Sequence, residues 1–286
     1  MTWYFVSDLH GRTRRYTELF RVCRENPPDV LCVGGDIYPS GFRVLRAGDA
    51  SIEEFHTTVL LDGFRALRGE LGSAYPRVFL IPGNDDPAVL VDGLLAGEYE
   101  GLWHYAQQRT FDTGSWVVAG YSYVTPSPFR LKDWERYDVS RYVDPGCIPP
   151  EQGLHTVPVE AHRIVHATIA DDLQELALNL DAERLVLLAH VPPYGGALDR
   201  AALDGVKVDH APVDVHVGSI ALRRWIERRQ PRVTLHGHIH ESARLTGSWR
   251  ETIGSTHAFG AAHDGPELAL IRFDPAVPAS AERLLL

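Results

Sequence analysis

Five short apolar runs in this chain are each followed, within a few residues, by side chains that can bind a metal ion. The runs are residues 3–6, 30–33, 78–81, 185–189 and 233–235. The side chains after them are Asp8 and His10, Asp36, Asn84 and Asp85, His190, and His238 and His240. Short apolar runs of this kind are typical of buried strands. Because open α/β sheets build their sites at the carboxyl ends of parallel strands, the pattern predicts one site that gathers these side chains.

Helices are predicted between the strands of the first half. In residues 13–26 and again in residues 51–68, apolar side chains recur at helical spacing. Asp86, followed by Pro87, is expected to cap the next helix. Alternating strands and helices imply parallel strands joined by right-handed crossovers.

The second half of the chain changes in character. Residues 111–116 are typical of a hairpin turn, and residues 121–158 form an irregular stretch rich in proline and aromatic residues. Further helices are predicted over residues 159–179 and 219–229, and antiparallel strands over residues 243–246, 249–253 and 268–273. We therefore expect an α/β fold with a single domain over residues 1–286 and an inserted loop or lid at about 121–158. Its expected architecture is a four-layer α/β/β/α sandwich of mixed sheets.

Composition narrows the classes of partner. The formal charge of −10 and the pI near 5.7 argue against non-specific attraction to nucleic acid, and Lys132 and Lys207 are the only lysines. No apolar stretch approaches the roughly 20 residues that span a bilayer, and the first six residues are too short for a signal peptide. Cys23 and Cys32 are predicted to be small buried hydrophobes, which favours a reducing, cytoplasmic compartment.

The chemistry of the predicted site suits divalent ions, because its ligands are carboxylates, imidazoles and an amide oxygen without a thiolate. Asp8 and His10 are two residues apart, a spacing that directs both side chains to one side of an extended chain. Two ions roughly 3.5–4 Å apart would lower the pKa of a shared water and stabilise charge at a phosphoryl group. The adjacent His236 is expected to complete its strand rather than bind metal.

Taken in order, these segments resemble the calcineurin-like metallophosphoesterase superfamily. The motifs that carry the resemblance are Asp8-Leu9-His10, Gly35-Asp36, Gly83-Asn84-Asp85, His190 and Gly237-His238-Ile239-His240, spread over residues 3–245. A closer resemblance, to the Icc-like predicted phosphoesterases, rests on residues 190–195 with Leu198-Asp199, and on Gly218-Ser219 followed by residues 237–242.

The resemblance implies a pair of divalent ions, with manganese, iron, zinc and nickel all open as the metal. It implies that the first ion is held by Asp8, His10, Asp36 and His240, and the second by Asp36, Asn84, His190 and His238. The expected catalytic residues are Asp36, Asn84, Asp85 and His190. The implied reaction is hydrolysis of a phosphodiester or phosphomonoester by attack of a hydroxide held between the ions.

One position departs from the common pattern of that superfamily. Many members have a histidine directly after the asparagine, where it is thought to protonate the leaving group, and this chain has Asp85. A carboxylate beside two cations is expected to be a poor proton donor. We hypothesise instead that Asp85 orients a ligand such as His10 or a water bound to the metal.

Several functions stay open at this stage. The leading hypothesis is a phosphoesterase for a small phosphoester, with a nucleotide as one candidate; Phe129, Trp134 and Tyr137 could stack on a base or merely cover the sheet edge. A metal-dependent nuclease and a catalytically weak protein-interaction scaffold are the alternatives. The sequence does not indicate an oligomeric state.

Overall fold

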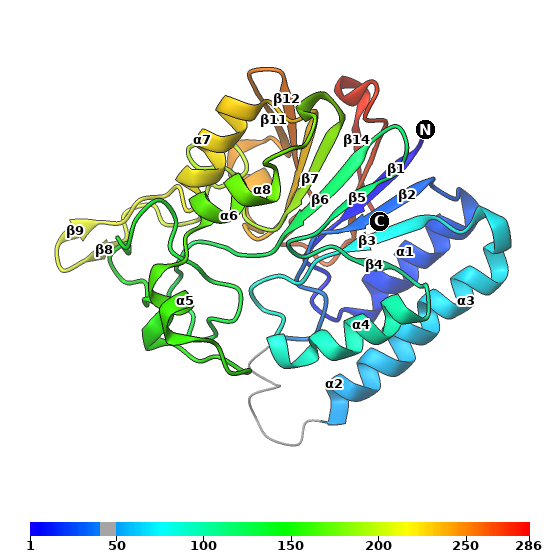
Figure 1. Ribbon diagram of the computed structural model, residues 1–286, viewed down its shortest axis with the longest axis horizontal. Helices are drawn as coiled ribbons and strands as arrows, with labels where there is room; N and C mark the ends of the chain where they lie inside the picture. Colours follow the sequence, from blue (N-terminus) through cyan, green and yellow to red (C-terminus); the bar gives the residue numbers. More distant parts are fainter. Residues whose placement is uncertain (41–49) are drawn as a thin grey trace.

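Two sheets stack face to face between outer helices in the computed structural model, which describes residues 1–40 and 50–286 (Figure 1). The first six-stranded sheet has the order β14 (Glu282–Leu285), β13 (Ala269–Phe273), β1 (Trp3–Val6), β2 (Val30–Val33), β3 (Arg77–Leu80), β4 (His104–Tyr105). The second has the order β11 (Arg250–Ile253), β12 (Thr256–Gly260), β10 (Val233–His236), β7 (Leu185–Ala189), β6 (Val117–Tyr121), β5 (Thr110–Asp112).

Both sheets are mixed, with parallel strands in the middle and antiparallel strands at the edges. Strands β1, β2, β3 and β4 are parallel, as are β12, β10, β7 and β6. Strands β13 and β14 extend the first sheet in antiparallel pairs, and β5 and β11 do the same at the two edges of the second. The parallel middles place several strand ends at one edge of the sandwich, which is where the predicted ligands follow.

Three apolar layers hold the sandwich together. Side chains such as Phe5, Phe79 and Leu188 fill the space between the sheets. A second layer packs α1 (Thr13–Glu25), α3 (Asp62–Leu71) and α4 (Val91–Tyr99) on the first sheet, and a third packs α6 (Ile169–Leu176) and α7 (Ile220–Arg229) on the second (Figure 1). The predicted four-layer α/β fold is therefore confirmed.

Helices of the first half follow the predicted pattern. The apolar stripe of α1, which includes Tyr16, Leu19 and Cys23, is buried against the first sheet. Residues 51–68 lie in a continuous run of α2 (Ala50–Phe55), a π-helical turn (His56–Leu61) and α3. Further along, the Ser219 hydroxyl accepts the backbone N–H of Leu222 at 2.9 Å and so caps α7 as predicted.

Two predictions for the later part of the chain are wrong, and two strands were not predicted. Residues 243–246 belong to the short helix α8 (Ser242–Thr246), which ends at Gly247 with a φ of 72°, a left-handed residue that closes a helix. The helix expected over residues 159–179 is two helices, α5 (Ala161–His166) and α6, because Thr168 caps α6 by accepting the N–H of Asp171 at 3.1 Å. Strands β12 and β14 were not predicted, because neither has the continuous apolar run of the central buried strands.

The irregular stretch after β6 contains a single 3₁₀ turn (Pro150–Gln152) before α5 and no strand of either sheet within its described residues. It is fixed to the sandwich by polar contacts. Asp138 accepts the Ser219 hydroxyl at 2.5 Å, and the buried Lys132 forms an ion pair with the buried Glu135. A hairpin of β8 (Lys207–Val208) and β9 (Ala211–Pro212) projects beside it (Figure 1). That the stretch is an insertion into one domain stays a prediction.

Cys23 and Cys32 are buried, as predicted, and burial raises the pKa of the Cys23 thiol to about 12. Among the described helices, none combines the length and the apolar character needed to cross a membrane.

Candidate metal centre

Four of the predicted ligands converge where β1, β2 and β10 end. One ligand atom from each of Asp8, His10, Asp36 and His240 lies within 4.8 Å of the other three. His10 Nε2 is 3.1 Å from His240 Nε2 and 3.5 Å from Asp36 Oδ2, and His240 Nε2 is 3.2 Å from Asp8 Oδ1. This group has the same members as the set implied for the first ion.

A second group adjoins the first through Asp36. His190 Nε2 lies 3.1 Å from Asn84 Oδ1 and 3.5 Å from Asp36 Oδ2. The His190 and His238 rings are 5.3 Å apart between centroids. The structure thus brings the second set together as well, with Asp36 between the two groups. Which of these side chains bind metal stays a prediction.

The backbone at the ends of these strands adopts conformations that side-chain-bearing residues rarely take. Asp8, His10, Asp36 and His238 have φ angles of 56°, 48°, 51° and 74°. Such left-handed conformations cost free energy and cluster at functional sites. They turn the chain sharply after each strand, so that the side chains face the gap between the strand ends.

The turn before Asn84 also needs a glycine. A Cβ atom at Gly83 would lie 2.2 Å from Asp36 Oδ1 and 2.4 Å from the Asp36 backbone nitrogen. Only a residue without a side chain lets the loop after β3 approach Asp36 this closely. The glycine in the Gly83-Asn84 motif is therefore explained by contact between two ligand-bearing loops.

Main-chain contacts fix the tautomers of two histidines. His190 Nδ1 lies 2.7 Å from the carbonyl oxygen of Gly34, and a carbonyl can only accept. Nδ1 therefore carries a proton, and Nε2 faces the acceptor oxygens of Asp36 and Asn84, where it holds the second proton in the metal-free protein and would present a lone pair to a metal ion once that proton is lost. His236 differs, because Nδ1 faces the Val191 carbonyl at 2.9 Å and Nε2 faces the Thr234 hydroxyl at 2.8 Å. Both its nitrogens have partners within the sheet, as expected for a residue that completes its strand.

Mutual charges shift the pKa values of the first group strongly. Burial alone would raise the pKa of Asp8, but the hydrogen bond and charge of His240 lower it to about 2. Burial alone would lower the pKa of His10, but the charge of Asp36 and the contact with Asp85 raise it to about 9. In the metal-free protein, protonated imidazole therefore balances carboxylate, in the place where a bound cation would do so.

The second group shows a split between its two histidines. Burial lowers the pKa of His190 and His238, but the charge of Asp36 reverses the effect at His190 and raises its pKa to about 9. At His238, burial and the positive charge of His190 lower the pKa to about 3. His238 is therefore a neutral imidazole, the form that can bind a metal ion.

Comparison with known proteins agrees with this geometry. The family model for calcineurin-like phosphoesterases matches residues 1–242. The chain belongs to this family. No curated protein sequence matches it. Among solved structures, the protein TT1561 of Thermus thermophilus is similar, with 14% identity, a TM-score of 0.59, and coverage of 99% of this chain and 98% of that one.

A dimetal phosphatase from Danio rerio is also similar, with 13% identity, a TM-score of 0.53, and coverage of 100% of this chain and 98% of that one. At such low identities the likeness shows the calcineurin-like fold alone. The family resemblance proposed from the sequence motifs is confirmed.

Asp85 directly follows Asn84 and contacts both groups of predicted ligands. Its Oδ2 atom lies 3.4 Å from His10 Nδ1, and its Oδ1 atom accepts the Ser40 hydroxyl at 3.5 Å. Its backbone N–H donates to Asp36 Oδ1 at 2.8 Å. The residue thus contacts a predicted ligand through its side chain and another through its backbone, which suits an orienting role.

The prediction that Asp86 caps a helix is wrong. Its buried carboxylate instead accepts three backbone N–H groups, from Ile37 at 2.9 Å, Tyr38 at 2.9 Å and Gly83 at 2.8 Å. The helical segment after it begins with a 3₁₀ turn at Ala88, without a side-chain cap. Asp86 therefore ties the loop after Asp36 to the loop before Asn84. No local signal separates this role from a cap, because two of the three partners, Ile37 and Tyr38, are 49 and 48 residues away.

Arg15 is a second residue that the sequence analysis missed. It is buried in α1, and its guanidinium donates to the backbone carbonyl of Asp8, to that of His263 at 3.2 Å and to that of Gly265 at 2.6 Å. The Arg15 side chain thus connects the left-handed turn at Asp8 to the loop after β12. The sequence could have indicated this role, because Arg15 lies on the buried side of α1 and a buried arginine needs hydrogen-bond partners.

The aromatic residues of the irregular stretch do not form an open stacking surface. Trp134 and Tyr137 are 7% and 2% exposed, while Phe129 is 53% exposed. The Trp134 indole donates to the Asp86 carbonyl at 2.7 Å, and the Tyr137 hydroxyl donates to Glu151 at 2.8 Å. Trp134 and Tyr137 therefore fit a covering role better than a role in base stacking. Trp134 also supports the loop that carries Asp86.

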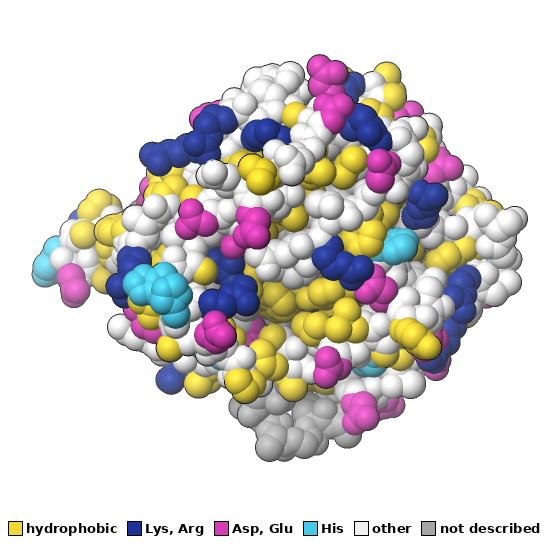
Figure 2. Space-filling model, in the orientation of Figure 1, with side chains coloured by type: hydrophobic (Ala, Val, Ile, Leu, Met, Phe, Trp, Pro, Cys, Tyr) yellow, Lys and Arg dark blue, Asp and Glu magenta, His cyan; other side chains and the backbone are white. Residues whose placement is uncertain are grey.

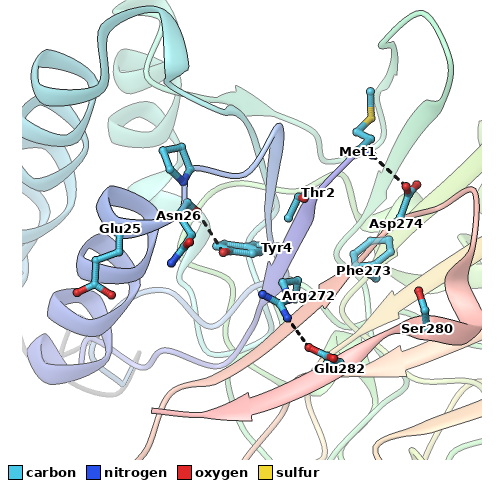
Figure 3. Close-up of a pocket in the computed structure, with 11 residues that line it drawn as sticks. Met1, Thr2, Tyr4, Glu25, Asn26, Arg272, Phe273, Asp274, Ser280 and Glu282 are labelled. Carbon is cyan, nitrogen blue, oxygen red and sulfur yellow. Dashed lines mark hydrogen bonds and ion pairs between the residues drawn. The ribbon is translucent and has the colours of Figure 1, made fainter.

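A separate hollow of about 750 Å³ opens at the amino end of β1 (Figure 3). Its charged groups are largely paired with one another: the Met1 amino group lies 3.0 Å from Asp274, and Arg272 lies 2.6 Å from Glu282. It contains none of the predicted ligands, which lie at the opposite, carboxyl ends of the strands.

Proposed function

We propose that this chain hydrolyses a small phosphodiester with two bound divalent metal ions, and that a phosphomonoester is its second class of substrate. The observation that carries the proposal is the pair of adjoining ligand groups that share Asp36. The family assignment supports phosphoester hydrolysis, and the donor set supports the metal requirement.

The residues present fit a pair of ions. Two imidazole nitrogens, of His10 and His240, face each other at 3.1 Å beside the carboxylates of Asp8 and Asp36. A cation between these four side chains could bind to all of them. Without a cation, protons shared between imidazole and carboxylate must balance their charges. In the proposed assignment Asp8, His10, Asp36 and His240 hold one ion, and Asp36, Asn84, His190 and His238 hold the other. When bound, the ions would supply Lewis-acid activation of water and stabilisation of charge at phosphorus.

The chain's own residues set the charge and orientation of this site. Asp8 and Asp36 are the only carboxylates in the proposed ligand set, so they offset only part of the charge of two divalent ions. When the attacking hydroxide is counted as well, about one of the four positive charges of the two ions remains, and this suits a monoanionic diester better than a dianionic monoester. Asn84 contributes an oxygen without charge, and Asp85 holds the His10 ring by the 3.4 Å contact with Nδ1.

The test uses metal-free protein to which manganese, iron, zinc, nickel or magnesium is added separately. Hydrolysis of bis-p-nitrophenyl phosphate and of p-nitrophenyl phosphate is measured for the wild type, for Asp36→Asn and for Asp62→Asn. Asp62 is a matched control, because it is an exposed aspartate on α3 that pairs with Arg65, away from the strand ends.

We expect one or more of the metals to restore turnover, with the diester preferred, and Asp36→Asn to abolish it while Asp62→Asn leaves it unchanged. Turnover without metal, or turnover that survives Asp36→Asn, would refute the proposal. Tight binding of metal without turnover of either ester would favour the scaffold alternative.

A further inference from the structure

A pair of histidines on α5 lies outside the metal centre and has no role in the proposed reaction. His162 and His166 are one helical turn apart, and their ring centroids are 4.6 Å apart with the ring planes inclined by 40°. Both residues are exposed. Figure 2 shows histidine side chains gathered over α5 on the left of the face drawn.

The imidazole nitrogens of this pair are available. No hydrogen bond or ion pair joins either ring to another residue in the part of the chain that the structure describes. This distinguishes them from His190 and His236, whose nitrogens face carbonyl and side-chain partners. Two such rings at positions i and i+4 of a helix lie on the same face and can direct their nitrogens to one ion.

We propose that His162 and His166 together bind one divalent ion of the borderline class, such as zinc, nickel or copper, at the surface of α5. Imidazole ligands favour these ions, while magnesium and calcium prefer oxygen. With two protein ligands and water in the remaining positions, this outer site binds more weakly than a site with four protein ligands. It is separate from the proposed pair of ions, whose ligands follow strands and not a helix.

Binding there would act on α5 itself. The helix has six residues, too few to be stable by its own hydrogen bonds. One ion can contact both rings only when the segment is helical, because only the helix brings the two rings together. The free energy of metal binding therefore adds to the stability of the helical form. The outer site therefore couples metal concentration to the order of the segment between the irregular stretch and α6.

Retention on immobilised metal separates this site from the metal centre. A resin-bound copper or nickel ion can reach the exposed rings on α5, whereas the ligands at the strand ends are largely buried. Untagged wild type, His162→Asn and His166→Asn are compared, with His210→Asn as control because His210 is a lone exposed histidine in the β8–β9 hairpin.

We expect the wild type and His210→Asn to be retained and eluted by imidazole, and both α5 variants to lose retention. Retention of His162→Asn and His166→Asn equal to that of the wild type would overturn the proposal. So would loss of retention in His210→Asn alone. Neither outcome bears on the hydrolytic activity, so failure here is distinguishable from failure of the proposed function.

Amide hydrogen exchange tests the effect on α5. With zinc at a hundredfold excess over its dissociation constant, exchange in a peptide that covers residues 161–167 should slow by up to about a hundredfold in the wild type. It should not change in His166→Asn, nor with magnesium in place of zinc. Equal protection in wild type and variant would contradict the coupling.

Discussion

Replacement of Asp86 by alanine removes the acceptor that three buried backbone N–H groups share. The groups belong to Ile37, Tyr38 and Gly83. Each buried donor left without an acceptor costs about 1–3 kcal/mol, so the free energy of unfolding should fall by about 3–9 kcal/mol. That is a large part of the roughly 5–15 kcal/mol that stabilises a typical domain. Water entering the vacated volume would bring the loss towards the lower end of this range.

Two further variants calibrate this prediction. Asp86→Asn keeps one oxygen for Ile37 and Tyr38 but presents an NH₂ group towards Gly83, so its loss should be smaller. Asp181→Ala is the matched control, because Asp181 is exposed and accepts a single N–H, from Glu183 at 3.0 Å. We expect it to lose about 1 kcal/mol.

Urea unfolding of the metal-free proteins, followed by circular dichroism, measures these losses. Burial and the charge of Asp36 raise the pKa of Asp86 to about 7, so at pH 8, where most of the carboxylate is ionised, this charge opposes folding, and its removal places the expected loss at the lower end of the range. An unfolding free energy of Asp86→Ala within about 1 kcal/mol of that of Asp181→Ala would refute the reasoning. It would show that the three N–H groups find other acceptors.

Two other predictions concern metal binding. Arg15→Met should weaken binding of the first ion by about 10–100-fold, because the turn that carries Asp8 loses the side chain that holds it. Calorimetric titration measures this binding. It should show no such change for Arg21→Met, because Arg21 is an exposed residue of the same helix. Because the pKa values of His10 and His190 lie at about 9 without metal, binding at pH 7.5 should release up to about two protons and tighten as the pH rises towards 9. Titrations in buffers of different ionisation enthalpy measure this release, and identical apparent enthalpies in all buffers would contradict it.

The parts of the fold that were predictable are those where neighbouring residues decide the outcome. The stripe of Tyr16, Leu19 and Cys23 specifies α1 because all three face the same layer. The Ser219 cap is also local, since donor and acceptor are three residues apart. The segments that carry the predicted ligands stand out in the sequence because each closely follows a buried apolar run.

The parts that were not predictable depend on distant partners. Strand β12 has a mixed sequence, and its place inside the sheet depends on parallel pairing with β10, from Val233↔His257 onwards, as well as on antiparallel pairing with the neighbouring β11. The carboxylate of Asp86 looks like a helix cap in sequence, yet its acceptor role is set by loops brought together by the sheet. In the same way, nothing near Arg15 in the sequence indicates the carbonyls of His263 and Gly265, which are 248 and 250 residues away.

The pairing of β1 with β13 has a consequence for the order of folding. Trp3 lies opposite Phe273 and Phe5 opposite Ile271, so one edge of β1 stays open until nearly the whole described chain has been synthesised. During translation, the turn with Asp8 and His10 would extend from a strand with one unpaired edge, which is a template for pairing with other chains. A nascent chain halted before Ala269 should therefore depend on chaperones, and the metal centre should form late, after the last strands have docked.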